Sequence, residues 1–268
     1  MEFDFGNGQI SETTIRLSVF ASVFIIMAVA ESLWPRKIRT QPRFTRWFTN
    51  IGIVVLDSLA VRIIFPVVAV GVAQYAHSRG WGLLNLITLP FWLKVLISAV
   101  LMDMAIYWQH VVSHKLPILW RVHQMHHADR DIDVSTGTRF HPIEIVLSML
   151  YKFAVILLLG PAALGVFLFE VLLNGSAMFN HANVRLPLGL DKVLRLLFVT
   201  PDMHRVHHSL HRDEIDSNYG FNLAIWDRIF GTYIDQPRDG HDKMVIGMKG
   251  YQSDKPSSII WSLLLPFK

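Results

Sequence analysis

The feature that most constrains the fold of this chain is a series of long apolar stretches. The first, Thr14–Leu33, is almost wholly apolar, and about 20 such residues in a helix span the roughly 30 Å hydrocarbon core of a bilayer. Further apolar stretches lie at about 48–76, 91–108, 143–159 and 162–179. Because unpaired backbone groups are costly in lipid, the sequence predicts an all-α integral membrane protein.

Composition supports this class. Hydrophobic residues make up 52% of the chain and charged residues only 17%, against roughly 25% charged residues in a soluble domain. The chain has no cysteine, which excludes a disulfide-stapled module, an Fe–S cluster and any thiolate metal site. The net charge of +4 does not indicate nucleic-acid binding, because the basic residues cluster beside the apolar stretches.

Charge placement predicts the topology. Five basic residues follow the first stretch within one short loop, namely Arg36, Lys37, Arg39, Arg43 and Arg46, and this loop is expected in the cytoplasm. Pro66 is expected to kink or split the second stretch, and the nearly uncharged loop 77–89 to lie on the other side. The third stretch then returns the chain to the cytoplasm. The arms 143–159 and 162–179, separated by Gly160 and Pro161, form two spans or a re-entrant hairpin.

This pattern predicts about four transmembrane or re-entrant helical segments and a cytoplasmic helical cap. We expect one domain over residues 1–268, with N-terminal spans at 14–108 and a membrane hairpin at 143–180. Residues 109–142 and 181–268 supply the cap, and residues 186–199 are expected on the membrane surface. Residues 1–13 contain no Lys or Arg, so no signal peptide is expected.

Histidines give the main indication of function. Eleven of the 13 fall between His110 and His211, and most of these are spaced three or four residues apart. Residues at this spacing share one face of a helix, so each cluster can direct several imidazoles at one point. The clustered residues are His110 and His114; His123, His126 and His127; and His204, His207, His208 and His211, with His181 standing alone.

Imidazole is the commonest metal ligand, and this many histidines exceed the needs of one ion. Two adjacent metal ions, each with four or five nitrogen ligands, fit the count. The chain has no His-Glu-x-x-His motif of a zinc hydrolase and no glutamates at the positions of a soluble di-iron carboxylate bundle.

Other polar residues are expected outside the ligand set. His77 and His241 are typical of interfacial histidines, His141 of a supporting group or a helix cap, and His211 of a supporting group. Asp103 lies seven residues before His110, and Asp103 and Asp227 are candidate acceptors for ligand N–H groups.

Several segments resemble the fatty acid hydroxylase/sterol desaturase superfamily. The run from Leu119 to His127 reads LWRVHQMHH and looks like the central histidine box of that superfamily. The first box is similar to HVVSH at His110–His114, and the last to TPDMHRVHHS at Thr200–Ser209. The segments RFHP, NYG and WDRIFGTY, beginning at Arg139, Asn218 and Trp226, also look like family segments, so the resemblance covers roughly residues 95–235.

The resemblance implies a helical membrane bundle whose cytoplasmic cap holds two iron ions, with zinc possible as found, and uses O2 to hydroxylate or desaturate a lipid. Carried over by position, the implied metal ligands are His110, His114, His123, His126, His127, His181, His204, His207 and His208. Some members have a further histidine four residues before His181, where this chain has Ala177. The ligand set is then one short, or water or Asn174 completes it.

Cutting an unactivated C–H bond needs a metal–oxygen species, for which the protein supplies orientation and a dry site. We find no dinucleotide-binding fingerprint, so an external donor is implied: a reductase, a ferredoxin or a cytochrome b5-like protein. Arg212 and the five basic residues of the 36–46 loop either form a basic docking face or, for those five, only set the topology.

Competing interpretations remain at the level of the sequence. A histidine-rich membrane zinc protein with a hydrolytic or structural role is the main alternative. A metal transporter is a further one, although transport sites lie near the bilayer midplane. The oligomeric state is open, and so is the substrate, with sterol, fatty acyl or sphingolipid, glyceryl ether and carotenoid lipids all possible.

Overall fold

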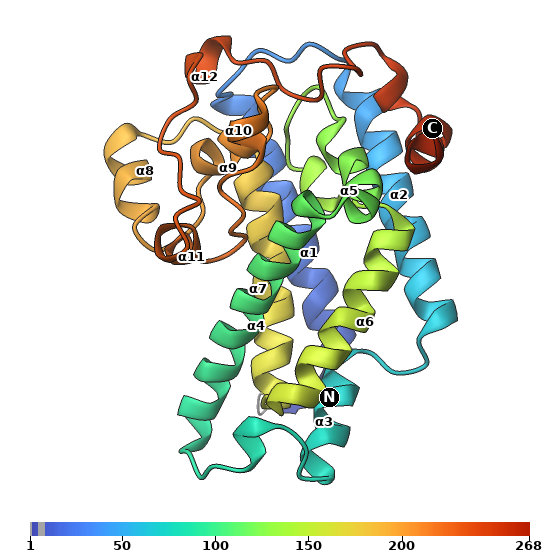
Figure 1. The fold of residues 1–268 in the computed structure, drawn as a ribbon, viewed down its shortest axis with the longest axis vertical. Coiled ribbons are helices and arrows are strands. Elements are labelled where there is room, and N and C mark those ends of the chain that lie inside the picture. Colours follow the sequence, from blue (N-terminus) through green and yellow to red (C-terminus); the bar gives the residue numbers. More distant parts are fainter. Residues whose placement is uncertain (1, 5–8) are drawn as a thin grey trace.

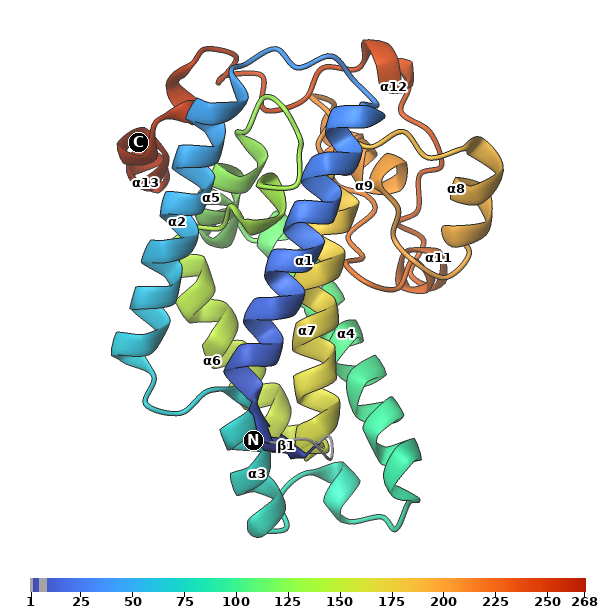
Figure 2. The ribbon, with the colours of Figure 1, turned by 180° about the vertical axis from the view of Figure 1, so that it is seen from behind.

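The computed structural model describes residues 2–4 and 9–268, and it shows a tall bundle of helices beneath a cap of shorter ones (Figures 1 and 2). The long helices are α1 (Glu12–Leu33), α2 (Arg43–Ile64), α3 (Ala69–Ser78), α4 (Phe91–Lys115), α6 (Pro142–Leu159) and α7 (Ala163–His181). Five stretches are long and apolar enough to cross a membrane, with α2 and α3 counted as one. The helical membrane fold predicted from the sequence is confirmed, with a count close to the expected one.

Pro66 interrupts the second stretch, as predicted. The helix α2 ends at Ile64, Phe65 has extended backbone angles, and α3 begins at Ala69. A proline within a helix removes one backbone hydrogen bond and clashes with the preceding turn. The chain therefore leaves the outer edge of the bundle after α2 and re-enters beneath it as α3 (Figure 2).

The helix α4 is longer than its apolar stretch. The apolar pattern stops near Trp108, but the helix continues to Lys115. Its last two turns contain His110 and His114. Figure 1 shows that this end of α4 reaches the cap beside α5.

The cap consists of short helices and loops from distant parts of the sequence. It contains α5 (Pro117–His127), α8 (Leu188–Leu194), α9 (Pro201–His207), α10 (Arg212–Ile215), α11 (Ile225–Ile229), α12 (Gly240–Lys243) and α13 (Ile259–Leu264). Four 3₁₀ turns lie at Leu83–Asn85, Thr136–Thr138, Lys255–Ser257 and Leu265–Phe267. At the opposite end, β1 (Glu2–Asp4) pairs antiparallel with β2 (Gln9–Ser11).

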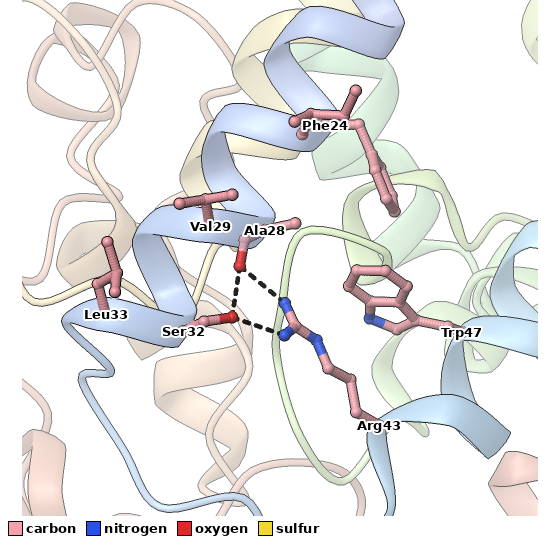
Figure 3. A pocket seen from close by; sticks show the side chains of 8 residues that line it. Phe24, Ala28, Val29, Ser32, Leu33, Arg43 and Trp47 are labelled. Atoms are coloured by element: carbon pink, nitrogen blue, oxygen red, sulfur yellow. Dashed lines mark hydrogen bonds between the residues drawn. The ribbon is translucent and has the colours of Figure 1, made fainter.

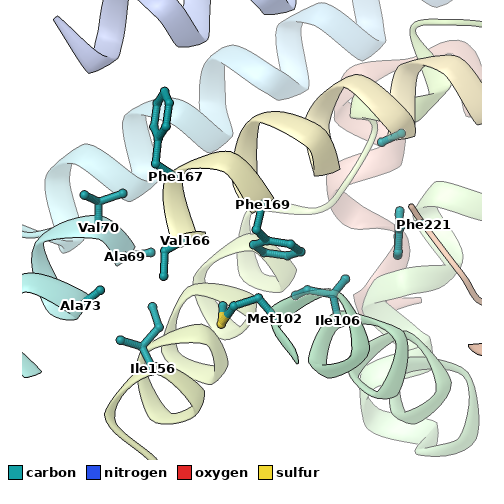
Figure 4. Close-up of a cluster of buried hydrophobic side chains, with 11 residues drawn as sticks. Ala69, Val70, Ala73, Met102, Ile106, Ile156, Val166, Phe167, Phe169 and Phe221 are labelled. Atoms are coloured by element: carbon teal, nitrogen blue, oxygen red, sulfur yellow. The ribbon is translucent and has the colours of Figure 1, made fainter. Parts of the chain in front are cut away.

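An apolar cluster holds the bundle together beneath the cap (Figure 4). It joins α3, α4, α6 and α7 through buried side chains that include Ala73, Met102, Ile156 and Phe169. The cluster reaches Phe221, a cap residue, so the core of the bundle is continuous with the floor of the cap. Within a bilayer, such packing stabilises the bundle through van der Waals contacts between closely fitted side chains.

Charged groups inside the bundle are paired. Glu170 of α7 is buried and contacts Arg16 of α1 at 2.8 Å and Lys152 of α6 at 2.7 Å. Charges within a membrane span are costly unless they face protein partners, so this cluster joins three helices at a fixed register.

Residues 186–199 form α8 and the turn that follows it. Leu188, Val193 and Leu196 are exposed there, which is the pattern of a helix whose apolar face lies on a membrane surface.

Candidate metal centre

The nine histidines implied as ligands come from four separate helix ends. The helix α4 carries two in its last turns, α5 ends in three, and α7 ends in one. The helix α9 presents the last three, with His208 at its C-cap. Thr200 caps the start of α9 and Pro201 occupies its first turn, which fixes where this short helix begins and therefore the phase of its histidines.

The nine side chains gather into two adjacent groups. Within each group, one nitrogen from every histidine lies within 4.8 Å of the others. The first group, called here site A, contains His110, His114, His123, His127 and His207. The second, site B, contains His126, His181, His204 and His208. All nine side chains are buried.

The Nε2 atoms converge within each site. In site A, the Nε2 atom of His110 lies 3.2 Å from that of His123 and 3.1 Å from that of His207. In site B, the Nε2 atom of His181 lies 3.0 to 3.2 Å from those of His126, His204 and His208.

The hydrogen bonds of the Nδ1 atoms determine whether the convergent Nε2 atoms carry a proton or a lone pair. The Nδ1–H groups of His110, His181 and His207 donate to the backbone carbonyls of Tyr219 (2.8 Å), Ala177 (2.6 Å) and Ser217 (2.6 Å). Because a neutral imidazole carries one proton, a donating Nδ1 leaves Nε2 as a lone pair. The facing Nε2 atoms are then buried acceptors without donors, an arrangement that a bound cation satisfies.

Two further histidines have similar support. The Nδ1–H of His123 donates to the Oε1 atom of Glu144 at 2.7 Å, and that of His126 donates to the carbonyl of Arg139 at 3.1 Å. Metal-binding histidines usually donate the second N–H in this way, which orients the ring and raises its basicity. The donor set and its tautomers therefore fit metal ions, with five ligands for site A and four for site B.

Burial keeps the site neutral. Desolvation lowers the pKa of His126, His127, His204 and His208 well below the usual 6.5, and neighbouring histidines lower it further. The pKa of His207 falls to about 3, mainly through burial. At pH 7 these rings are neutral, which is the form that binds a metal.

Some polar nitrogens have no protein partner. Both ring nitrogens of His114 and of His127 are buried without a hydrogen bond, as is the Nδ1 atom of His204. The Nδ1 atom of His114 lies 3.5 Å from the carboxylate of Asp216. Buried orphan nitrogens are rare in folded proteins, and their concentration at sites A and B is a second sign that these residues fit a metal ion.

Asp103 and Asp227 contact the segment that supports His110 rather than the histidines themselves. Asp103 accepts hydrogen bonds from Asn222 and Trp226, both at 2.8 Å. Asp227 accepts from the backbone N–H of Tyr219 at 2.7 Å and of Gly220 at 2.9 Å. Both aspartates hold the 218–226 segment, whose Tyr219 carbonyl supports His110. These hydrogen bonds go to this segment and not to the N–H group of a histidine, which is where the sequence suggested they would go.

The other predicted supporting residues lie further out. His141 is the N-cap of α6, where its Nδ1 atom accepts from the N–H of Ile143 at 3.1 Å. His211 lies at the surface and pairs with Asp239 at 2.6 Å, because α9 ends before it and turns its side chain away. Asn174 donates to the Glu170 carbonyl one turn below in α7, and its side chain is exposed, whereas the histidines of site B are buried.

The two histidines predicted to be interfacial differ in burial. His77 is exposed and its Nδ1 atom lies 3.0 Å from the amide oxygen of Asn85. His241 is buried, and its Nε2 atom lies 3.8 Å from Asp202.

Sequence reasoning missed the direct acceptors. Glu144 is the one carboxylate hydrogen-bonded to a ligand histidine in the described part of the chain, and most of the others are backbone carbonyls. A glutamate in the first turn of an apolar stretch was the available signal for Glu144, whereas carbonyls carry no side-chain signature.

A buried ion-pair network fixes the loop between α5 and α6 against helix α2. Arg46 donates to both carboxylate oxygens of Asp129, at 2.8 and 2.7 Å, and also contacts Asp133. Asp129 also accepts from the hydroxyl of Thr136 at 2.9 Å. The loop that leads to Arg139 is thereby held against α2, and the Arg139 carbonyl is in turn the acceptor for His126.

The basic loop of residues 36–46 is mostly consumed in ion pairs. Arg36 pairs with Asp202 at 3.1 Å, Arg43 with Glu31 at 2.6 Å, and Arg46 with Asp129. Arg39 also contacts Glu31, and the ammonium of Lys37 donates to the Asp242 carbonyl. Among the arginines of the predicted docking face, Arg212 has the most exposed side chain, at 56%.

A groove of about 380 Å³ lies between α1 and α2 (Figure 3). Its walls are apolar, with Phe24, Val29 and Trp47 among them, and the guanidinium of Arg43 closes one end by donating to Ser32 and Ala28. No histidine lines it, so it is separate from sites A and B.

These observations define a class: a helical bundle with five membrane-length stretches and two adjacent all-histidine groups in its cap. Residues 95–232 match the sequence model of the fatty acid hydroxylase family. The chain therefore belongs to the fatty acid hydroxylase family, in agreement with the resemblance of its histidine boxes.

Relatives of known name extend the comparison. The chain is 33% identical over 230 residues to ornithine lipid hydroxylase OlsE of Rhizobium tropici, covering 82% of this chain and 67% of the relative. It is 35% identical over 147 residues to alkylglycerol monooxygenase of Homo sapiens, covering 54% of this chain and 31% of the relative. It is 29% identical over 167 residues to methylsterol monooxygenase 2-2 of Arabidopsis thaliana, covering 60% and 61% respectively. No solved structure gives a significant match.

Proposed function

We propose that this protein is a membrane-bound non-haem di-iron enzyme that uses O2 to hydroxylate or desaturate a membrane lipid. The observation that carries the proposal is the pair of adjacent groups of buried, neutral histidines whose Nε2 lone pairs face one another. Three named relatives from different organisms are a lipid hydroxylase and two monooxygenases, which supports oxygen chemistry on a lipid.

The positions of the nine histidines suggest which of them would bind each metal ion. Site A offers five imidazoles to one ion, and site B offers four to the other. When bound, two iron ions would supply electrons to O2 and the oxidant needed to cut an unactivated C–H bond. An all-imidazole set suits iron, copper, nickel and zinc, so the ligands alone do not select iron.

The chain itself supplies positioning and a dry environment. The Tyr219, Ala177 and Ser217 carbonyls and the Glu144 carboxylate hold the rings in one tautomer and orientation. All nine histidines are buried, so bulk water is kept from the reacting carbon. Site B has one histidine fewer than site A, and Ala177 occupies the position at which some family members have a further one.

The bundle supports lipid access from the bilayer. Sites A and B lie just above the apolar helices α4, α6 and α7, so a lipid tail among the spans can present a carbon to the cap. The basic loop 36–46 lies on the same side as the cap, and by the positive-inside rule that side is the cytoplasm. The active site is then on the cytoplasmic face.

The experiment pairs metal analysis with lipid analysis. Tag-free protein is purified in detergent and its metal content measured by mass spectrometry, while lipids are analysed after aerobic expression with a reductase. We expect about two irons per chain and a lipid that gains one oxygen or loses two hydrogens. The product also names the substrate among ornithine lipids, glyceryl ethers, sterols and other membrane lipids.

Matched variants sharpen this test. His181→Ala removes a ligand that reaches three neighbours in site B, and it should lower the iron content and abolish the product. His211→Ala removes a histidine that pairs with Asp239 outside both sites, and it should change neither. Stoichiometric zinc that persists after iron loading, with no lipid change, would favour a hydrolytic or structural zinc protein instead.

A further inference from the structure

Trp120 forms an aromatic bridge between site A and the surface of the cap. Its ring centroid lies 4.9 Å from that of His114 and 5.4 Å from that of His127. The side chain is half-buried, so its outer edge reaches solvent. Tyr219, the other large ring against His114, is buried, so Trp120 is the aromatic side chain that joins His114 and His127 to the outside.

One cation lies against the Trp120 ring, and a second is linked to it through a shared carboxylate. The guanidinium of Arg212 lies 4.8 Å from the Trp120 ring centroid, and the Nη2 atom of Arg212 donates to the His114 carbonyl at 3.3 Å. The ammonium of Lys115 lies 3.1 Å from Asp216, which also pairs with Arg212 at 3.2 Å. Lys115 and Arg212 are 55% and 56% exposed, whereas Asp216 is 18% exposed, so the surface presents net positive charge.

The rim of this patch is apolar. Leu116 and Ile118, at the corner between α4 and α5, are exposed. An aromatic centre with cations and apolar side chains around it has the composition of a protein-binding surface. We call the patch formed by Lys115, Leu116, Ile118, Trp120 and Arg212 the Trp120 patch.

We propose that the Trp120 patch is the docking site of an acidic one-electron carrier protein, and that electrons reach site A through the Trp120 ring. This inference rests on the proposed function. Hydroxylation consumes two electrons: a lipid C–H, O2, two electrons and two protons give a lipid C–OH and water. A reduced one-electron carrier supplies them in two encounters and is itself oxidised each time, while Trp120 mediates transfer without net change.

Charge complementarity is the reason to expect an acidic carrier. The basic loop of residues 36–46 is tied up in ion pairs with the cap, whereas the Trp120 patch keeps two exposed cations that share one carboxylate. Electrostatic complementarity speeds the encounter of weakly bound redox partners, whose interfaces are small. The patch is small, and it contacts the ligands of site A directly.

The first test is binding, which does not depend on turnover. The iron-loaded full chain is placed in phosphatidylcholine nanodiscs, and a plant-type ferredoxin or a cytochrome b5 is titrated calorimetrically at low and high salt. Arg212→Glu should weaken binding at least tenfold and flatten its salt dependence. Arg185→Glu, which reverses a cation of similar exposure elsewhere on the cap, should change the affinity less than twofold.

The second test is the route of the electron. In anaerobic stopped flow, the oxidation of prereduced carrier is followed by its own absorbance. Trp120→Leu should slow it at least tenfold, with Trp120→Phe in between, because phenylalanine keeps an aromatic ring against His114. Reduction of the same variants by dithionite should be unchanged, and their iron content should stay at the wild-type value.

Several outcomes would overturn the inference while the proposed function stands. One is wild-type carrier oxidation in Trp120→Leu, and another is unchanged affinity in Arg212→Glu. A third is quenching of a fluorophore attached to Ile118→Cys by spin-labelled lipids, because the patch would then lie in the bilayer. Absence of iron from the wild-type protein would instead overturn the proposed function.

Discussion

A histidine ring can bind metal through only one nitrogen in this site, and the acceptor on the other nitrogen decides which. The His110, His181 and His207 rings donate from Nδ1 to backbone carbonyls, and His123 donates to Glu144. A carboxylate acceptor raises the basicity of its imidazole more than a neutral carbonyl does. Glu144 is therefore the supporting residue whose side chain can be varied most directly.

Changes at Glu144 should lower metal affinity in a graded order. Glu144→Gln keeps an oxygen acceptor for the His123 N–H but removes the negative charge, and Glu144→Ala removes both. We expect the alanine variant to bind metal about 10–100-fold more weakly, with glutamine in between. Competition with a chromophoric chelator measures this, and Asp235→Asn at an exposed carboxylate serves as the control. Equal metal affinities for the wild-type protein, Glu144→Gln and Glu144→Ala would contradict a role for the Glu144 carboxylate.

The Asp227 carboxyl predicts a pH effect on stability. Burial raises the pKa of Asp227 from 3.8 to about 6, although Thr232 and two backbone N–H groups partly oppose the shift. Because the folded pKa is above the unfolded one, the stabilisation is complete below about pH 4 and is lost as pH rises through about 6. A shift of about 2 pKa units corresponds to about 3 kcal/mol.

Chemical unfolding of chelator-treated protein at pH 4 to 7 tests this effect. The wild-type free energy of unfolding should fall by about 3 kcal/mol more over this range than that of Asp227→Asn, which has no carboxyl to titrate. Parallel pH profiles for the two proteins would show that burial does not shift this carboxyl.

Sequence spacing grouped eight of the nine converging histidines, and the family resemblance added His181, but neither indicated the groups that support them. The i, i+3 and i+4 spacings placed nitrogens on one helix face, and the structure brings all nine into sites A and B. The division of the nine could not be predicted, because His126 and His127 are adjacent in sequence yet belong to different sites. Their separation follows from the rotation of about 100° per residue in a helix.

At the scale of elements, apolar length predicted which helices exist and polar contacts set where they end. Pro66 was visible in the sequence, and it splits α2 from α3. Apolar periodicity did not show the extension of α4 to Lys115, although the i, i+4 spacing of His110 and His114 indicated a helix there. Gly137 shows the same limit: a Cβ there would lie 2.3 Å from the Ala177 carbonyl, a tertiary approach that spacing does not reveal.

The element that most depends on buried charge is the loop between α5 and α6. Arg46→Met should leave Asp129 and Asp133 buried without their cation and lower the free energy of unfolding by about 3–5 kcal/mol. Arg130→Met removes an ion pair to Asp254, which is 92% exposed, and should cost less than about 1 kcal/mol. Denaturant titration in detergent compares the two, and a similar small loss for both would refute the structural role of Arg46.

At the scale of the whole molecule, the apolar surface lies on the helical bundle and many of the charged residues lie in the cap. The five membrane-length stretches form the lower part, and the paired basic loop, the histidine sites and the exposed face of α8 lie in or beside the cap. The sequence predicted this division because membrane spans are local in sequence. It could not predict how the cap closes, because its walls come from residues more than 90 positions apart, such as His110 and His207.

Because the chain has no cysteine, single introduced cysteines can report which side of the membrane the cap occupies. Asp254→Cys introduces one thiol on an exposed loop of the cap, and Ser78→Cys introduces one at the exposed end of α3, near the opposite end of the bundle. Because five basic residues accompany the cap side, a membrane-impermeant maleimide should label Ser78→Cys in intact cells and Asp254→Cys only after lysis. The reverse labelling pattern would place the histidine sites outside the cytoplasm and exclude a cytoplasmic electron carrier as the partner of the Trp120 patch.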